Sequence, residues 1–300
     1  MTAQPNAAVV GAGFRPDPRP LAPGLYFVAT PIGAARDITL RGLDILATAD
    51  VLAAEDTRTL RHLMEIHGVA LKDRQIVAYH DHNGDQARPK LLRALEAGKS
   101  VAYASEAGTP LVADPGFQLA RAAIAAGLTV LAAPGPSAVL AALTVSGLPS
   151  DRFLFAGFAP PTKGARQKML ENLAGVKATL VFYESPKRIS RFLIELSEGL
   201  GAGRDAAVCR ELTKRFEEVS RGTLGDLART FADRTVKGEI VVLVGWAEVV
   251  ADASGLEQAL RNALAVQSVK DAASDVAALL KLPRREVYQV ALKLAQEGQI

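Results

Sequence analysis

The stretch Leu25–Gly33, LYFVATPIG, joins a short apolar run to a stiff turn. The run Leu25–Ala29 predicts a buried strand, and the proline and glycine that follow predict its end. Four further turns follow apolar runs in the same way: Ser105–Pro110, Pro134–Ser137, Tyr183–Pro186 and Arg210–Lys214. Ligands of open α/β sheets bind at the carboxyl ends of the strands, so the five turns predict one composite pocket.

The chain from Leu25 to Gly147 alternates short apolar runs with stretches of helical spacing. Such repeated strand–helix units form a mainly parallel sheet that helices cover on both faces. The turn cluster Gly147–Asp151 marks the expected boundary, and beyond it adjacent strands with little helix between them predict a mixed sheet. We therefore expect one α/β domain over residues 23–148 and a second α/β domain over residues 149–248.

The two ends of the chain differ from this pattern. Residues 1–22 contain four prolines and no sustained apolar run, which predicts a disordered tail and not a signal peptide. Residues 249–300 predict a small helical region, in which Val269–Leu280 and Pro283–Glu297 form two helices around a brief turn. This arrangement is consistent with a helix-turn-helix, and a helical cap without nucleic-acid contact is the alternative.

Composition excludes several classes of protein and site. The chain is 49% hydrophobic and 22% charged, as expected for a soluble globular protein, and no apolar stretch reaches the ~18 residues of a membrane helix. The single cysteine, Cys209, excludes an internal disulfide and favours the cytoplasm. There is no P-loop, no complete G-x-G-x-x-G after a strand and no H-E-x-x-H, so a phosphate-cradling cofactor is disfavoured.

The basic residues are unevenly distributed. Net charge is only +3, yet residues 160–221 hold 12 Lys and Arg against 8 Asp and Glu. A polyanionic partner would use this surplus through contacts with its phosphates. The alternative is that these charges solvate helix faces.

Two polar motifs follow predicted strands. In Ala54–Arg58, the carboxylates could orient a hydroxyl group or accept its proton, or they could cap a helix. In Tyr79–Asn83, the pattern His80-Asp81-His82 is compatible with a metal site, with contacts to an RNA substrate, or with ordinary loop histidines. The sequence shows no obvious third protein ligand for a metal.

Taken together and in order, eight motifs resemble the ribosomal RNA small subunit methyltransferase I family of the tetrapyrrole-methylase-like superfamily. They are Val28–Gly33, Ala54–Arg58, Tyr79–Asn83, Glu106–Pro110, Asp114–Gly116, Pro134–Ala138, Phe182–Pro186 and Arg210–Lys214. The resemblance implies two α/β domains with S-adenosyl-L-methionine in the cleft between them, and a homodimer without membrane contact. It also implies 2′-O-methylation of a cytidine in small-subunit ribosomal RNA, with the RNA or the assembled small subunit as partner.

The resemblance also implies roles for individual residues. It places cofactor contacts on Pro31, Gly33, Ser105, Glu106, Gly108, Thr109, Pro110, Pro134, Gly135, Ser137, Tyr183, Ser185, Gly238 and Glu239. On this interpretation the catalytic candidates are Glu55, Asp56, Glu184 and Lys187, and no metal is needed. The expected RNA contacts are Arg58, His80, His82, Lys163, Lys214, Arg284 and Arg285. Ala34 and Glu106 depart from the Asn and Asp that are usual in the family.

Three alternative functions compete with this interpretation. The first is a methyltransferase of the same fold that acts on a tetrapyrrole or another small molecule. The second is a metal-dependent hydrolase built on His80, Asp81 and His82. The third is a ribosome-assembly factor that binds RNA without catalysis.

Overall fold

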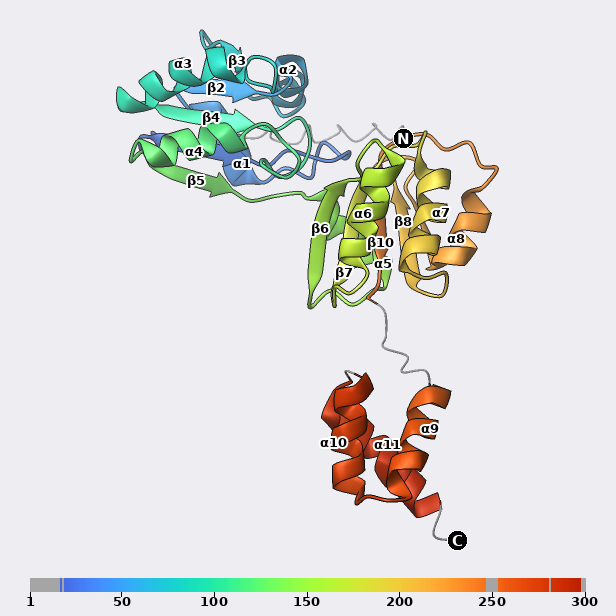
Figure 1. The fold of residues 1–300 in the computed structure, drawn as a ribbon. Helices are drawn as coiled ribbons and strands as arrows, with labels where there is room; N and C mark the ends of the chain where they lie inside the picture. The colour runs from blue at the N-terminus through green and yellow to red at the C-terminus, as the bar shows by residue number, and fades with distance from the viewer. Residues whose placement is uncertain (1–16, 18, 247–252, 281, 298–300) are drawn as a thin grey trace, which may run out of the picture. The chain divides into compact units, whose positions relative to one another are not determined.

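The computed structural model describes residues 17, 19–246, 253–280 and 282–297, and the chain divides into two units, Met1–Trp246 and Ala247–Ile300 (Figure 1). Most of the predicted tail lies outside the described residues. Leu21, which was expected to belong to that tail, instead packs against the core of the first unit. Lys281, in the predicted turn of the helical region, also lies outside the described residues.

The first sheet of the larger unit is parallel throughout. Its order is β3-β2-β4-β1-β5, with every neighbouring pair parallel. The strands are β1 (Gly24–Val28), β2 (Val51–Ala54), β3 (Ile76–Ala78), β4 (Ser100–Ala104) and β5 (Val130–Ala133). The helices between them are α1 (Leu40–Thr48), α2 (Thr57–Ile66), α3 (Gly84–Glu96) and α4 (Phe117–Ala125).

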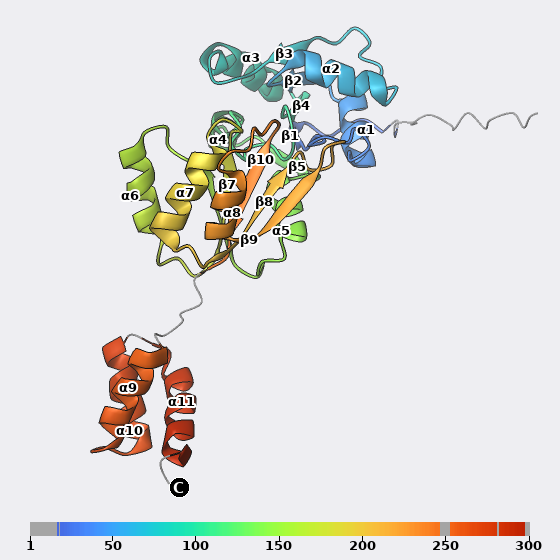
Figure 2. The same cartoon turned by 90° about the vertical axis from the view of Figure 1, so that its right-hand side faces the viewer.

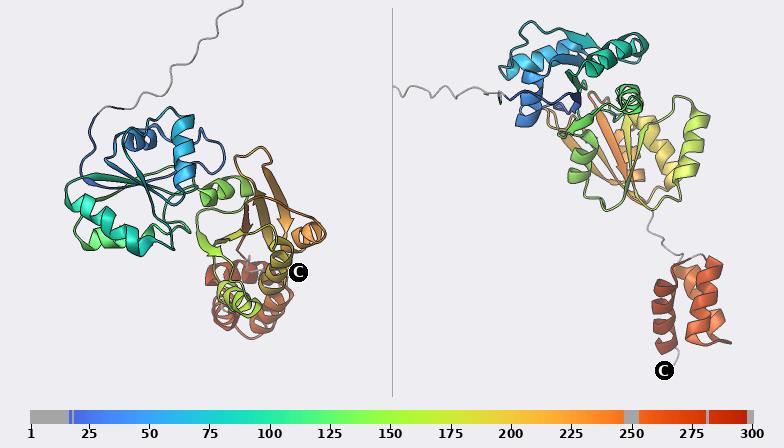
Figure 3. Two further views of the ribbon diagram at one scale, coloured as in Figure 1. Left: turned by 90° about the horizontal axis from the view of Figure 1, so that it is seen from above. Right: turned by 90° about the vertical axis from the view of Figure 1, so that its left-hand side faces the viewer.

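Helices cover both faces of this sheet because its strands are apolar on both sides. Along β1, Tyr26 and Val28 pack in one cluster with residues of α1 and α2, whereas Leu25 and Phe27 pack in another with residues of α3 and α4. The view from above in Figure 3 shows these two pairs of helices on opposite faces. The expected covered parallel sheet is therefore confirmed.

The second sheet is mixed, as expected. Its order is β6-β7-β10-β8-β9, in which β6 and β7 are parallel and the other pairs antiparallel. The strands are β6 (Phe153–Phe158), β7 (Thr179–Glu184), β8 (Asp205–Arg210), β9 (Glu218–Thr223) and β10 (Ile240–Val244). Helices α6 (Lys163–Leu173), α7 (Ile189–Leu200) and α8 (Leu224–Phe231) pack on one face through a large apolar cluster.

Helix α5 (Ala138–Ser146) covers the other face of the second sheet. Its residues Val139, Ala142 and Leu143 pack with Val241 and Leu243 of β10, and Figure 2 shows α5 beside β8 and β9. The boundary predicted at the turn cluster Gly147–Asp151 would assign this helix to the first domain. Because α5 packs on the second sheet, the chain passes from the first sheet to the second in the segment between β5 and α5.

The smaller unit is a helical bundle. It contains α9 (Ala253–Leu264), α10 (Val269–Leu280) and α11 (Arg284–Glu297), which share a core that includes Leu260, Val276 and Val287. The sequence predicts two helices in this region, and the structure adds α9 as a third. Among the described residues, no helix is long and apolar enough to cross a membrane.

Candidate active site

A cavity of about 470 Å³ lies in the first unit, where the turns of both sheets meet. Each of the five turns singled out in the sequence contributes to its wall, through Ile32, Gly108, Ser137, Ser185 and Leu212. The expected convergence of strand ends is therefore confirmed, and it has a simple physical cause. Parallel strands present their carboxyl ends at one edge of a sheet, so the turns that follow them are neighbours in space.

Hydrogen bonds tie the turns of the first sheet to one another. Thr30 and Gly108 exchange two backbone hydrogen bonds of 3.0 Å, and the Thr109 hydroxyl donates to the carbonyl of Pro136 at 2.8 Å. The buried Ser105 hydroxyl donates to the carbonyl of Gly108 at 2.6 Å. Ser105 therefore holds the shape of its own turn and is absent from the cavity lining.

Aromatic side chains form part of the wall from the second sheet. The Tyr183 ring packs edge-on against Phe155 at 4.8 Å and Phe158 at 5.5 Å between centroids. A bulge between Phe155 and Gly157 shifts the register of β6 just before Phe158, which lines the cavity. Burial, and then the charge of Glu239, raises the pKa of Tyr183 to about 12, so its hydroxyl stays neutral and able to donate.

Segments that belong to the two sheets of the larger unit touch closely beside the cavity. Gly33 packs so tightly that an added Cβ atom would lie 2.5 Å from Cγ of Lys214 and 3.0 Å from the carbonyl oxygen of Leu212. Gly238 has a φ of +93°, and an added Cβ there would overlap the side chain of Glu211. Both glycines are therefore required by the close approach of neighbouring segments.

Carboxylates line the first-sheet side of the cavity. Burial, followed by the charges of Asp114 and Glu106, raises the pKa of Glu55. Burial also raises the pKa of Asp114; its Oδ1 accepts hydrogen bonds from Tyr103 and Gly116, while its buried Oδ2 has no partner. A carboxyl group with a raised pKa in a cleft has the properties of a general base or acid.

Asp56 has a different environment from its neighbour Glu55. It is the N-cap of α2, where its carboxylate accepts from the backbone N–H groups of Arg58 and Thr59 and pairs with the Arg58 guanidinium. Its hydrogen bonds to Arg58 lower the pKa of Asp56 to about 2. Asp56 does not line the cavity, so the capping alternative describes its contacts.

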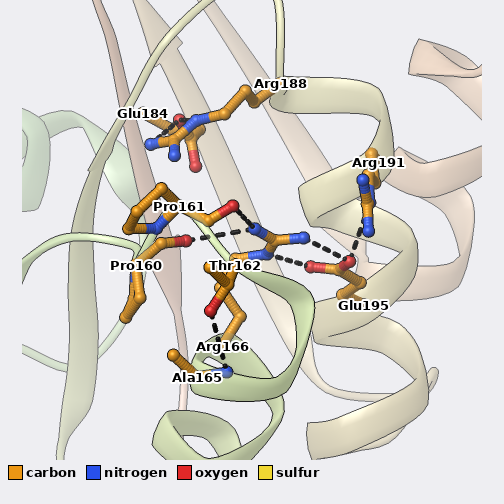
Figure 4. Close-up of polar contacts among 9 residues, drawn as sticks. All are labelled: Pro160, Pro161, Thr162, Ala165, Arg166, Glu184, Arg188, Arg191 and Glu195. Carbon is orange, nitrogen blue, oxygen red and sulfur yellow. Dashed lines mark hydrogen bonds and ion pairs between the residues drawn. The ribbon is translucent and has the colours of Figure 1, made fainter.

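Glu184 ends β7 and lines the cavity with one oxygen engaged and the other free. Its Oε1 accepts from the Ser185 backbone at 2.6 Å and from Arg188 at 2.7 Å, whereas its buried Oε2 has no partner. Close by, Arg166 is buried between the carbonyls of Pro160 and Pro161 and the carboxylate of Glu195, as Figure 4 shows.

The other predicted cofactor contacts divide into two groups. One group lines the cavity: Glu106, Gly108, Thr109, Ser137, Tyr183, Ser185, Gly238 and Glu239. The other group does not: Pro31, Gly33, Ser105, Pro110, Pro134 and Gly135. The structure also places four residues without a predicted role in the lining: Phe158, Val112, Asp114 and Cys209. Asp114 belongs to a quoted motif and could have been selected, whereas Phe158 carries no local signal.

The predicted RNA contacts and Lys187 lie outside the lining. Lys214 forms ion pairs of 3.0 Å with Glu211 and Glu239. Burial alone would lower the pKa of Lys214, but these two hydrogen-bonded carboxylates raise it. Lys163 lies in a second cavity with three glutamates, and Arg284 and Arg285 begin α11 in the other unit.

The histidine motif forms no metal site among the residues that the structure describes. His80 and His82 lie with their rings 6.1 Å apart, and no group of three or more potential ligands surrounds them or occurs elsewhere in the described chain. The buried Nδ1 of His80 has no hydrogen-bond partner. The geometry therefore gives no support to the metal-dependent hydrolase.

Comparison with known proteins identifies the family. The model of the tetrapyrrole (corrin/porphyrin) methylases matches residues 24–228, and that of the RsmI C-terminal HTH domain matches residues 248–295. A protein of Mesorhizobium japonicum named ribosomal RNA small subunit methyltransferase I is 51% identical over 278 residues, which cover 92% of this chain and 94% of that protein. The chain belongs to this methyltransferase family.

Other members of the methyltransferase I family are similar over almost the same length. The protein of that name from Mycobacterium tuberculosis is 44% identical over 91% of this chain and 96% of its own length. The protein from Synechocystis is 39% identical over 91% of this chain and 99% of its own length. The resemblance drawn from the eight motifs is thereby confirmed, as is membership in a methyltransferase family.

Solved structures confirm the fold of the larger unit. The methyltransferase CobJ superposes with a TM-score of 0.57 at 22% identity and covers 75% of this chain and 94% of its own. Diphthine synthase superposes with the same TM-score at 16% identity, covering 74% of this chain and 89% of its own. At such identities the likeness concerns the fold alone, because one fold carries many substrates.

Proposed function

We propose that this protein transfers a methyl group from S-adenosyl-L-methionine to the 2′-hydroxyl of a cytidine in small-subunit ribosomal RNA. The observation that carries the proposal is the cavity at the strand ends of both sheets, in a chain that is 51% identical to a protein named for this RNA. The free RNA or an assembled small ribosomal subunit is the proposed partner. A homodimer in the cytoplasm is part of the same proposal.

The cavity fits a small cofactor in size and chemistry. Its volume of about 470 Å³ lies in the range of ~300–1,000 Å³ that is usual for ligand pockets. The buried Oε2 of Glu184 supplies an unused hydrogen-bond acceptor, and Tyr183 and Ser185 supply donors beside it.

The proposed contacts follow from this lining. Lining residues that would hold the cofactor are Glu106, Gly108, Thr109, Ser137, Tyr183, Ser185, Gly238 and Glu239. The remaining predicted residues would act by shaping the turns: Pro31, Gly33, Ser105, Pro110, Pro134 and Gly135. When bound, S-adenosyl-L-methionine supplies an already activated methyl group.

In the proposed mechanism, Glu55 accepts the proton of the ribose hydroxyl. It lines the cavity, and its raised pKa makes its ionised form a better proton acceptor than an ordinary carboxylate. Asp56, with a pKa of about 2 and an ion pair to Arg58, would be a weak base and would serve as the cap of α2. Glu184 and Arg188 would orient the reactants, since position and orientation provide much of the acceleration in such transfers.

The proposed RNA contacts are spread over both units. Arg58, His80, His82, Lys163 and Lys214 belong to the first unit, and Arg284 and Arg285 to the helical unit. Lys187, proposed as a catalytic residue, would hold the phosphate beside the reacting ribose. Because basic side chains that contact phosphates release counterions, RNA affinity should fall steeply as salt rises.

Methyl transfer to defined substrates tests the proposal. Small ribosomal subunits that lack the modification, and free small-subunit RNA, are each incubated with labelled S-adenosyl-L-methionine, and the modified ribose is mapped. We expect label on one cytidine 2′-oxygen, with calorimetric binding of the cofactor and loss of transfer in Glu55→Gln. Transfer to a porphyrinoid precursor without transfer to either RNA substrate would contradict it.

A further inference from the structure

A tight turn between β8 and β9 carries an exposed aromatic residue. The backbone N–H of Glu217 donates to the carbonyl of Lys214 at 3.1 Å, which places Arg215 and Phe216 at the two central positions of the turn. The Glu217 carboxylate also accepts from the backbone N–H of Thr213 at 2.5 Å. These bonds hold the backbone of the turn and fix where its two central side chains begin.

Phe216 is 62% exposed in this turn. Turns favour Gly, Asn, Asp and Ser at their centre, so a large apolar side chain there goes against local preference. Such departures from local rules concentrate at functional positions. The guanidinium of Arg215 lies over the Phe216 ring at 5.4 Å from its centroid, and in the described part of the chain Arg215 makes no ion pair.

The neighbouring charges are already neutralised. Lys214 pairs with Glu211 and Glu239, and Arg210 pairs with Glu218 at 2.9 Å. The Glu217 carboxylate is engaged by the Thr213 backbone. Arg215 is therefore the cation of this turn that remains available to an anionic partner.

The turn lies beside the cavity. Leu212, four residues before Phe216, lines it, and Lys214 pairs with Glu239, which also lines it. On the opposite side, Thr213 accepts a hydrogen bond from the backbone of Ala34, in the loop after β1. A side chain on this turn therefore lies on a hydrogen-bonded part of the cavity wall, near segments of both sheets.

We propose that Phe216 and Arg215 form a stacking platform for an unpaired RNA base that flanks the methylated nucleotide. The inference rests on the proposed function and adds a substrate contact that is separate from the cofactor cavity. Aromatic side chains and arginine planes are the groups on which splayed bases stack, and an unpaired arginine beside the ring can also contact the phosphate. If Phe216 were instead an apolar contact for a second copy of the chain, the Arg215 guanidinium beside it would not be needed.

Single substitutions in the full-length protein test this platform. The RNA Kd and KM, the cofactor Kd and the oligomeric state are measured for Phe216→Ala, Phe216→Trp and Phe216→Leu, with Arg215→Ala as a second probe. We expect Phe216→Ala to raise the RNA Kd and KM by about 10-fold or more, with the cofactor Kd unchanged. Trp should preserve RNA affinity because it stacks, and Leu should not because it has no π face.

Phe153→Ala is the matched control. Phe153 is also an exposed phenylalanine, at 43%. It starts β6, whereas the cavity-lining Phe158 ends that strand, so Phe153 lies at the opposite end of β6 from the cavity. The control should leave both affinities unchanged.

Three outcomes would overturn the platform. They are an RNA Kd for Phe216→Ala within twofold of wild type, full recovery by Leu, or a change of oligomeric state that accounts for the loss. If wild-type protein binds the cofactor but methylates no RNA, the proposed function fails as well. If wild-type protein methylates RNA and Phe216→Ala does so equally well, only the platform fails.

Discussion

The backbone N–H of Ala34 donates a hydrogen bond of 3.1 Å to the Oγ1 of Thr213, joining the loop after β1 to the turn after β8. Thr213 adopts a φ of +63°, and Glu211 one of +49°, a region that β-branched and other L-residues seldom occupy. Strained residues of this kind gather where structure is held for a function. Because Ala34 uses its backbone here, this contact does not depend on the side chain at position 34.

Gly33→Ala should loosen the same junction. An added Cβ would lie 2.5 Å from Cγ of Lys214, 2.7 Å from Oγ1 of Thr213 and 3.0 Å from the Leu212 carbonyl oxygen, so one of the two segments must move. We expect kcat/KM to fall by about 10- to 100-fold, since small displacements at a site have effects of this order. Steady-state kinetics and the cofactor Kd measure the effect.

Gly164→Ala is the control for that substitution. Gly164 lies in the first turn of α6, and an added Cβ would meet nothing within 4 Å. Alanine is also the better helix former, so activity should remain unchanged and stability should not fall. Equal activity of the two variants would show that the Gly33 contact does not shape the site.

Glu55→Gln and Asp56→Asn should separate the two adjacent carboxylates. If Glu55 accepts the proton, its amide variant should lower kcat by about 10²–10⁴-fold while still binding the cofactor. Asp56→Asn should keep most activity, because Asn is an equally good helix cap and Asp56 does not line the cavity. Single-turnover methyl transfer measures both, and the reverse pattern would transfer the role to Asp56.

The charge environment of Glu55 predicts the pH dependence of catalysis. A base works in its ionised form, so the rate should fall as pH drops through the raised pKa of Glu55. Glu106→Gln removes one of the negative charges that raise this pKa, so the acid limb of the kcat profile should move to lower pH. Asp85→Asn removes the charge of an exposed carboxylate on α3 and should leave the acid limb of the kcat profile at the same pH. An unmoved limb in Glu106→Gln would remove Glu55 from consideration as the base.

The ionised Glu55 side chain should also lower the free energy of unfolding at neutral pH. Because its folded-state pKa is raised, the folded protein binds the proton more tightly than the unfolded chain, and stability falls as pH rises through this range. Glu55→Gln should therefore increase the free energy of unfolding at neutral pH, which urea denaturation measures against wild type. A loss of stability instead would mean that Glu55 is held by favourable contacts.

Arg166→Met should destabilise the part of the larger unit that is built on the second sheet. The Arg166 side chain is 5% exposed and binds Glu195 at 2.5 and 2.8 Å, so its removal leaves buried acceptors unpaired (Figure 4). We expect a loss of about 3–5 kcal/mol in urea unfolding, whereas Arg191→Met should cost less than about 1 kcal/mol because Arg191 is 62% exposed. The double variant Arg166→Met/Glu195→Leu should recover part of the loss, and equal costs for the two single variants would contradict this explanation.

Local pattern predicted much of this fold, since apolar periodicity and turn residues act within a few positions. The run Leu25–Ala29, for example, is apolar on both faces and predicts a strand, which the structure places at Gly24–Val28, shortly before Pro31. Helix α9 is absent from the sequence prediction although Leu256, Leu260 and Leu264 recur every four residues, which is a helical spacing. Packing against α10 and α11 adds the burial of Leu256 and Leu260 in a shared core.

The sequence by itself determined the two kinds of sheet, the turns at the strand ends and the family, because each depends on residue types at fixed spacing. Only the tertiary structure decided that α5 covers the second sheet, that a bulge directs Phe158 to the cavity, and that Glu55 differs from Asp56. These properties depend on packing between distant segments, and the raised pKa of Glu55 arises from burial and from the charges of Asp114 and Glu106. No local pattern encodes the surroundings of Glu55, whereas the low pKa of Asp56 comes from Arg58, only two residues along the chain.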